Sequence, residues 1–417
     1  MTDDLQGLRA QLRRELPAAV ELRHRLHRHP DRSGQEAHTL REVLAALPAA
    51  ATSRPTAGTG ALARLGGTGP AVAVRAELDA LEVTERTGLP WASTRPGLMH
   101  ACGHDVHLAA LVALARAVHV HGGPAPLLAV LQPREESYPS GALDISRSGL
   151  LEQEQATSIV AAHVQPLLAG RTVACTPGAV NASSDEFGIR ISGKGGHAGY
   201  PHRTRDPVVV LAHVVVALQS LVSRELDPMV PAVLSVTTLR AGSAVNVIPD
   251  SACARGTVRA FDVPTRQDLL RRLVEVVEHV AKAHGCEGSV ELVHGEPVLE
   301  NDKELAARTA QVLRELGLAV DGGFRTAGSD DFSYYGESLP SLMLFVGSEG
   351  AGGQLHSPTF SPADEQVEQV ATALLAGYAA AAETYLAVLP VTTKAVAGAA
   401  TSRGREPVSR GDGRPYA

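Results

Sequence analysis

The hydrophobic and polar positions of the chain alternate between two patterns. Short continuous apolar runs, which are typical of buried β-strands, are separated by longer segments with the apolar spacing of helices. The expected strands are Ala71–Arg75, Leu127–Leu131, Ser158–Ala162 and Leu342–Val346, and the expected helices are Leu5–His29, Leu108–His119 and Asp364–Val388. This alternation predicts an α/β fold.

The middle of the chain has a different pattern, in which apolar and polar residues alternate as in half-exposed strands. The expected strands here are Glu186–Ser192, Ala232–Leu239 and Cys253–Ala260, the expected helices are Pro207–Val222 and Arg266–His284, and Gly193–Gly196 is a glycine-rich turn. We therefore expect a small α+β sandwich, inserted at residues 185–292 into a larger domain made of residues 1–184 and 293–390. The remaining residues, 391–417, are rich in Gly, Ser, Arg and Pro and are predicted to be a disordered tail.

Composition narrows the functional classes. The chain has 417 residues, 44% of them hydrophobic and 20% charged, as in ordinary globular proteins, and its formal net charge is −7. This charge gives no net attraction to nucleic acid or to an anionic membrane, so we expect neither as a partner. The first thirty residues are charged throughout and show no secretory signal, and the most apolar stretches are interrupted by polar residues. We therefore expect a cytoplasmic location.

Polar residues with metal-binding side chains follow the ends of the expected strands. The first strand leads to Asp79, the second to Glu135 and Glu136, and the third to His163. A glycine-rich loop with His356 follows the fourth strand, and Cys102 and His104 precede the first core helix. Because α/β sheets place their sites at the carboxyl ends of parallel strands, these segments are expected to converge on one crevice. Carboxylate, thiolate and imidazole together are the ligand set of a transition-metal site.

Each residue alone has a simpler interpretation. A single histidine at a strand end is more often a hydrogen-bonded or surface residue than a ligand, and a single cysteine such as Cys102 is more often a small buried hydrophobe. Glu135-Glu136 by itself is usually a solvated pair in a loop. Cys102-Gly103-His104 is a stronger signal, because a glycine spacer at the start of a helix allows both flanking side chains to point the same way.

With these residues in view, the chain resembles the co-catalytic metallohydrolases of the aminoacylase/carboxypeptidase superfamily. Within it, the resemblance is to the branch of hippurate hydrolases, indoleacetyl-amino-acid hydrolases and N-acyl-amino-acid amidohydrolases. It extends over about residues 22–388. The matching stretches are HRHP at 27–30, RAELDAL at 75–81, MHACGHDVH at 99–107, LQPREE at 131–136, AHV at 162–164, SGKGGHAGYPH at 192–202, NVIPD at 246–250, AGSDDFSYY at 327–335 and LHSP at 355–358.

The resemblance implies roles for individual residues. It implies a metallopeptidase-type catalytic domain with a mixed sheet, an inserted lid that forms a homodimer, and two divalent metal ions per subunit, zinc or manganese, with cobalt or nickel as alternatives. The implied metal ligands are Cys102, which would bridge both ions, His104, Glu136, His163 and His356. Glu135 would be the general base, and Asp79 would fix a metal-bound histidine. From the lid, His197 would polarise the scissile carbonyl, while Asn246 and Arg259 would bind the substrate's carboxylate.

Some positions depart from the pattern of this branch. Glu77 stands where Asp is usual, Arg134 where Ala is frequent, and Gln165 where Trp is common. The segment Ser137–Ser140 replaces a glycine-rich run after the two glutamates. None of these changes removes an expected ligand.

The leading hypothesis is a metal-dependent amidohydrolase that releases a free amino acid from an N-acyl amino acid. A dipeptidase or carboxypeptidase with the same mechanism is the alternative within this class. A cysteine hydrolase would instead use Cys102 as nucleophile with His104 or His107 as its base. A third alternative is a metal-free, non-catalytic paralogue, which the presence of every expected ligand disfavours.

Overall fold

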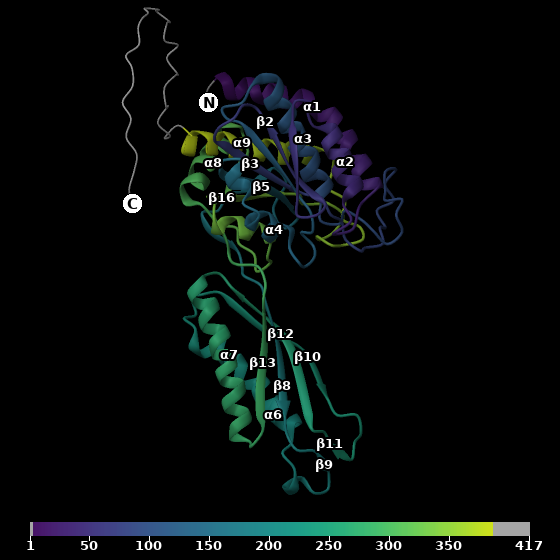
Figure 1. Ribbon diagram of the computed structural model, residues 1–417, viewed down its shortest axis with the longest axis vertical. Helices are drawn as coiled ribbons and strands as arrows, with labels where there is room; N and C mark the ends of the chain where they lie inside the picture. The colour runs from purple at the N-terminus through teal and green to yellow at the C-terminus, as the bar shows by residue number, and fades with distance from the viewer. Residues whose placement is uncertain (1–2, 387–417) are drawn as a thin grey trace, which may run out of the picture.

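The computed structural model describes residues 3–386, and in it the chain forms a broad catalytic domain and an elongated lid (Figure 1). The catalytic domain is built on an eight-stranded sheet of order β1-β2-β4-β3-β5-β16-β6-β15. Its strands are β1 Thr52–Thr56, β2 Gly60–Leu65, β3 Ala71–Glu77, β4 Leu127–Gln132, β5 Ala156–Gln165, β6 Thr172–Ala174, β15 Ala319–Asp321 and β16 Ser341–Gly347. The central strands β4, β3, β5 and β16 run parallel, and β1 and β2 pair antiparallel to their neighbours. At the other edge, β6 pairs antiparallel with β16 and parallel with β15. The expected α/β fold with a mixed sheet is confirmed.

Helices cover both faces of this sheet, which explains why its central strands are mostly apolar. Val72 and Val74 of β3 point into a core shared with α1, α3, α8 and α9, while Ala71 and Ala73 point into a second core on the opposite face. The helices of the first core are α1 Asp3–Arg28, α2 Ala37–Ala46, α3 His104–His121, α8 Lys303–Glu315 and α9 Glu365–Leu386. The second core is closed by α4 Gly141–Arg147, α5 Leu150–Gln153 and the 3-10 segment η3 Asp331–Glu337.

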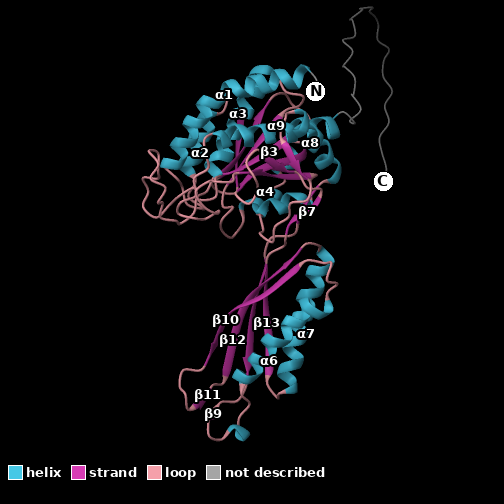
Figure 2. Ribbon diagram, turned by 180° about the vertical axis from the view of Figure 1, so that it is seen from behind, coloured by secondary structure: helices cyan, strands magenta, loops and turns pink. Residues whose placement is uncertain are grey.

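The lid is a four-stranded antiparallel sheet of order β10-β12-β8-β13, covered on one face by two helices (Figure 2). Its elements are β8 Asp185–Ser192, α6 Pro207–Ser220, β10 Ala232–Ala241, β12 Ser251–Ala260, α7 Val263–Ala283 and β13 Glu287–His294, with a π-turn at Leu221–Glu225. A two-stranded ribbon, β9 Gly196–His197 with β11 Val247–Ile248, forms the tip that lies farthest from the catalytic domain (Figure 1). Strands β10 and β13 are the edges of the lid sheet.

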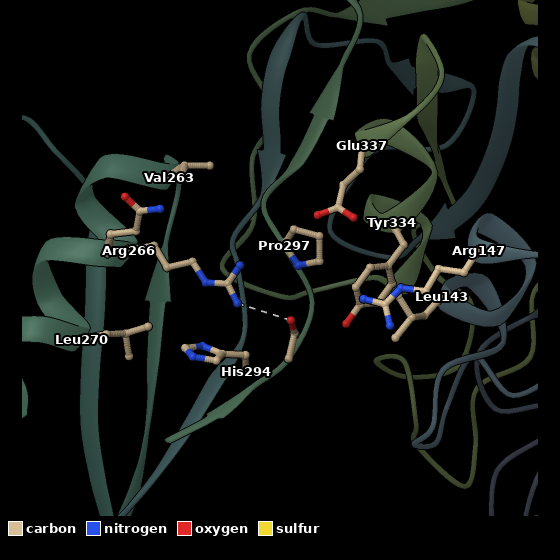
Figure 3. A pocket seen from close by; sticks show the side chains of 11 residues that line it. Leu143, Arg147, Val263, Arg266, Leu270, His294, Pro297, Tyr334 and Glu337 are labelled. Atoms are coloured by element: carbon tan, nitrogen blue, oxygen red, sulfur yellow. Dashed lines mark hydrogen bonds between the residues drawn. The ribbon is translucent and has the colours of Figure 1, made fainter. Parts of the chain in front are cut away.

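Two short connections join the lid to the catalytic domain, and ion pairs brace them. The guanidinium of Arg266, near the start of α7, donates two hydrogen bonds of 2.7 Å to the carboxylate of Asp185, where β8 begins. It also donates to the carbonyl oxygen of Gly295 at 3.3 Å, in a cleft between the two domains (Figure 3). Arg266 therefore ties together the two points at which the chain enters and leaves the lid.

The structure extends several expected elements and adds others. The helix expected at Leu108–His119 begins four residues earlier, at His104, so the candidate ligand His104 lies in its first turn. Strands β1 and β13 and helices α2 and α8 were not expected from the sequence. The end of the helix expected to reach Val388, and the tail predicted at residues 391–417, lie outside the described residues.

Candidate active site and metal centre

The four parallel central strands deliver the candidate site residues to one edge of the sheet. Asp79 lies two residues beyond β3, Glu135 and Glu136 lie three and four residues beyond β4, and His163 lies near the end of β5. His356 comes from the loop after β16, and Cys102 and His104 come from the start of α3. These strands are direct neighbours in the sheet, so the convergence expected from the sequence is present.

The five expected ligand side chains form one cluster. Donor atoms of Cys102, His104 and Glu136 all lie within 4.8 Å of one another. The Sγ atom of Cys102 is 3.4 Å from Nε2 of His163. On the other side, Nε2 of His356 is 3.4 Å from Oε1 of Glu136. Close contacts thus connect all five candidate ligands, through Cys102 to His163 and through Glu136 to His104 and His356.

Hydrogen bonds fix the tautomers of two of these histidines. Nδ1 of His104 lies 2.9 Å from the carbonyl oxygen of Asp79, and Nδ1 of His163 lies 2.7 Å from the carbonyl oxygen of Val164. A carbonyl oxygen only accepts, so both Nδ1 atoms carry the hydrogen and both Nε2 atoms present a lone pair to the cluster. Nε2 of His104 and Oε1 of Glu136 are buried without any hydrogen-bond partner. Unpartnered buried acceptors that point at one another fit a pair of metal ions.

The environment of Cys102 also favours a cation. Burial raises the pKa of its thiol well above the ordinary value, and the carboxylates of Glu136 and Glu135 raise it further. Burial lowers the pKa of the neighbouring His163 to about 3, with a further contribution from His107, so its imidazole is neutral at pH 7. His163, the imidazole in contact with Cys102, therefore does not support a nucleophilic thiolate as an imidazolium. A thiolate becomes stable when it binds a metal ion.

Glu135 lies beside the cluster, about as close to His104 as Glu136 does. One of its carboxylate oxygens, Oε2, is 3.8 Å from Nε2 of His104. Burial raises the pKa of Glu135 well above the ordinary value, and the carboxylates of Glu136, Asp330 and Asp331 add to this rise. A carboxyl group that binds a proton readily and faces the cluster is suited to carry a proton between water and a leaving group.

Asp79 contacts the site in two ways. Its carboxylate accepts hydrogen bonds from the backbone N–H of Glu136 at 3.0 Å and from the hydroxyl of Ser33 at 2.6 Å. Its contact with His104 is made by the backbone carbonyl at 2.9 Å, whereas the nearest carboxylate oxygen is 3.7 Å from the ring. The side chain therefore holds the loop that carries Glu136, and the main chain orients the histidine.

Backbone conformation at the site explains several sequence features. Gly103, the spacer between Cys102 and His104, has φ +85°, and a Cβ atom there would lie 2.6 Å from a methyl group of Val164. Arg134, just before the two glutamates, and His356 are among the few non-glycine residues with positive φ, at 52° and 65°. Strained residues of this kind collect where the surrounding structure fixes a functional side chain.

The lid residues are not brought to this cluster. His197 lies in the ribbon at the tip of the lid, beside Asn246, whose carbonyl oxygen accepts from Ala198 N–H at 3.0 Å. Arg259 lies near the other end of the lid, where its Nη1 donates to the hydroxyl of Ser329 at 3.0 Å. Within one chain, Arg259 reaches the loops of the catalytic domain, while His197 and Asn246 lie at the far end (Figure 1).

Several buried residues support the site through contacts that the sequence did not predict. The ring of His107 is held on both sides. Its Nδ1 lies 2.9 Å from the carboxylate of Glu77, and its Nε2 accepts a hydrogen bond of 3.0 Å from the backbone N–H of Val164. Buried carboxylates of Glu36 and Asp331 bind the loop that carries Glu135 and Glu136. Only the stretch AGSDDFSYY, noted as part of a family pattern, gave a signal for Asp331.

Comparison with known proteins decides the family. The profile of Peptidase family M20/M25/M40 matches residues 73–382, most of the chain. The chain belongs to this family. A relative in Bacillus subtilis (strain 168), N-acetyl-L-cysteine deacetylase, is 35% identical over 348 residues, which cover 82% of this chain and 83% of the relative. The IAA-amino acid hydrolase ILR1-like 4 of Arabidopsis thaliana is 36% identical over 362 residues, covering 83% of this chain and 81% of the relative.

Among solved structures, the YXEP protein of Bacillus subtilis, described as a dinuclear metal-binding peptidase of family M20, superposes with a TM-score of 0.78. It is 29% identical, and the match covers 88% of this chain and 98% of that one. The M20 chain described here is thus a metal-dependent amidohydrolase whose site is suited to two divalent ions.

Proposed function

We propose that this M20 enzyme hydrolyses the amide bond of N-acyl amino acids and releases the free amino acid, using two zinc or manganese ions held by Cys102, His104, Glu136, His163 and His356. The observation that carries this proposal is the cluster of Cys102, His104 and Glu136, with Nε2 of His104 and Oε1 of Glu136 buried without a hydrogen-bond partner and Glu135 beside them. The relatives support the substrate class, since they include an N-acetyl-L-cysteine deacetylase and a hydrolase of IAA-amino acids. A soft thiolate among the ligands suits zinc.

The residues of the chain divide the reaction between them. Two divalent ions, when bound, supply positive charge that polarises the amide carbonyl and lowers the pKa of water from about 15.7 toward 7. Glu135 takes the proton of the attacking water and returns it to the leaving nitrogen, a role that suits the raised pKa of its carboxyl group. The backbone carbonyl of Asp79 keeps His104 in the tautomer whose Nε2 has a free lone pair. The side-chain carboxylate of Asp79 accepts a hydrogen bond from the backbone N–H of Glu136 and keeps that residue in place.

The neutral ring of His197 is held in the tautomer that can donate a hydrogen bond through Nε2. The backbone N–H of Gly199 lies 3.0 Å from Nδ1 of His197 and donates to it, so in the neutral ring the hydrogen is on Nε2. Nε2–H then points away from this turn as a donor for the oxyanion that forms on the amide oxygen. Within the described residues 3–386, Arg259 forms no ion pair, so its guanidinium is available for the substrate's carboxylate. Asn246, at the other end of the lid, would join it there from the second chain of the dimer proposed below.

We further propose that the enzyme is a homodimer through its lid and that His197 acts in the partner's site. The outward face of α6 exposes Val208, Val209 and Val216, and the edge strand β10 exposes Val233 and Leu239. The segment Pro207–Glu225 is apolar enough to cross a membrane, although its other face packs on the lid sheet. An apolar helix face beside an open strand edge fits a second copy of the same surface. The cytoplasmic location expected from the sequence stays a prediction.

A substrate panel tests the proposed reaction. Metal-loaded enzyme is given acetyl, benzoyl and indoleacetyl amino acids and dipeptides, and release of the free amine is measured. We expect N-acyl amino acids to be cleaved faster than dipeptides with a free amino group. Cleavage of dipeptides alone would contradict the proposed substrate class and favour the dipeptidase alternative.

Cys102 provides an independent prediction. A thiolate shared by two cations reacts poorly, so Cys102 should resist alkylation in the metal-loaded protein and react after chelation. Prior alkylation should block rebinding of metal. The measurement is mass spectrometry of the peptide that contains Cys102. The free, partly exposed thiol of Cys253, which lies in the lid, is the internal control. Equal alkylation of Cys102 with and without metal would argue against ligation.

A further inference from the structure

The loop that carries Glu135 and Glu136 is held at both of its ends by buried carboxylates. It runs from Pro133, after β4, to Ser140, the N-cap of α4. At its start, the backbone N–H of Arg134 donates to the carboxylate of Glu36 at 2.9 Å. That carboxylate also accepts from the backbone N–H of Gly34 and the hydroxyl of Thr59. The positive φ of Arg134 is therefore stabilised by a fixed acceptor.

A single carboxylate, that of Asp331, joins the two ends of the loop. Gln132, the last residue of β4, donates to it through Nε2 at 2.8 and 2.9 Å. Beyond the loop, the hydroxyl of Ser140 donates at 2.7 Å and the backbone N–H of Ala142 at 3.3 Å. Asp331 is only 1% exposed, so these hydrogen bonds are shielded from water.

The loop closes so tightly that its end admits no side chain. The backbone N–H of Gly141 donates to the carbonyl oxygen of Arg134 at 3.2 Å. A Cβ atom on Gly141 would lie 1.7 Å from the carbonyl oxygen of Pro133. The backbone between these two points, which carries both glutamates, thus depends on how its ends are held together.

Asp331 is itself fixed by a buried network that reaches the opposite side of the site. Arg75, in β3, donates through Nη2 to Asp331 at 2.9 Å and through Nη1 to Glu77. Glu77 binds Nδ1 of His107, and Nε2 of His107 accepts from Val164 N–H, next to the ligand His163. The network therefore links the loop of Glu135 to the strand end of His163.

We propose that Asp331 is a positioning residue, whose carboxylate holds the loop so that the carboxylate of Glu135 faces the attacking water. This inference rests on the proposed role of Glu135 as general base. Every partner of Asp331 named above is a hydrogen-bond donor, which requires an acceptor on all sides. Asparagine has the same shape but would turn an N–H₂ group toward one of these donors.

The test is a double-mutant cycle of Asp331→Asn and Glu135→Gln, measured on metal-loaded enzyme with an N-acetyl amino acid. Displacing a catalytic group by about 1 Å costs roughly 100-fold in rate, so Asp331→Asn should lower kcat by about that factor. KM and the metal content should stay close to those of the wild type. In the Glu135→Gln background, the same substitution should change kcat by less than about twofold, because the group it positions is already gone.

Two further variants separate positioning from loss of stability and from loss of charge. Asp302→Asn is the matched control: Asp302 caps α8 by accepting from Leu305 N–H at 2.8 Å, away from the site, and its loss should leave kcat unchanged. Ser140→Ala keeps the charge of Asp331 and removes one of the loop's anchors. We expect a smaller loss of kcat, about tenfold, which is again absent in the Glu135→Gln background.

The outcomes are distinguishable. A loss from Asp331→Asn that is as large in the Glu135→Gln background as in the wild type would overturn the positioning role, as would wild-type kcat in Asp331→Asn. If Asp331→Asn does not fold, the same comparison is made with Ser140→Ala. A loss of kcat that is equally large in the Glu135→Gln background would again overturn the positioning role. Wild-type turnover of Glu135→Gln alone would instead contradict the proposed role of Glu135 as general base, on which this inference rests.

Discussion

Glu135→Gln should lower kcat by about 10²–10⁴-fold, the range that a general base typically contributes. The substitution is nearly isosteric and removes no candidate ligand, so the protein should still bind two metal ions per chain. The loss should therefore appear in turnover and not in metal content. Steady-state kinetics together with elemental analysis of the same sample measure both quantities.

Glu136→Gln is the matched comparison, because both glutamates lie near His104 but Glu136 also contacts His356. It should lower metal content as well as turnover, since an amide is a weaker ligand than a carboxylate. If Glu135→Gln kept turnover close to that of the wild type, Glu135 would not be the base. If it lost metal as Glu136→Gln does, its role would be ligation.

Mixing two inactive variants should restore activity. His197→Ala lacks the donor from the lid, and Glu135→Gln lacks the base. In a heterodimer in which His197 acts on the partner's site, one site lacks both groups and the other is intact. Random exchange makes about half of the dimers heterodimers, so about a quarter of the wild-type activity should return.

The position of His197 at the tip of the lid is the reason for this expectation. Were His197 to act in its own chain, each site of the heterodimer would lack one group and the mixture would stay inactive. Subunit exchange is verified independently with differently tagged chains, and unmixed variants are the controls. Inactivity despite verified exchange would contradict the action across the dimer.

The parts of the fold that could be predicted are those in which burial dominates. β3 and β4 are buried along their whole length, so most of their residues are apolar and stand in consecutive runs. β1 and β13 lie at sheet edges and are largely exposed, and their pairing is decided by neighbours in space. Pattern reasoning missed them because they bury too little apolar surface to leave a signal.

The residues of the candidate site also fall into two groups, those that the sequence indicated and those that only the fold revealed. Cys102, His104, Glu135 and Glu136 stand in short motifs next to predicted strands or helices, so spacing and residue type indicated them. The supporting contacts join residues far apart in the sequence, such as Glu36 with Arg134 and Asp331 with Ser140. Their carboxylates look like ordinary polar positions until the fold shows that they are buried.

Amide hydrolysis in this site should depend on two bound metal ions. The most direct measurement is a titration of the chelated, metal-free protein with zinc or manganese, recording release of the amino acid from an N-acetyl amino acid after each addition. We expect no turnover without metal and an increase that levels off at about two ions per chain. Turnover by the metal-free protein equal to that of the loaded protein, abolished by alkylation of Cys102, would contradict the claim and favour a cysteine hydrolase.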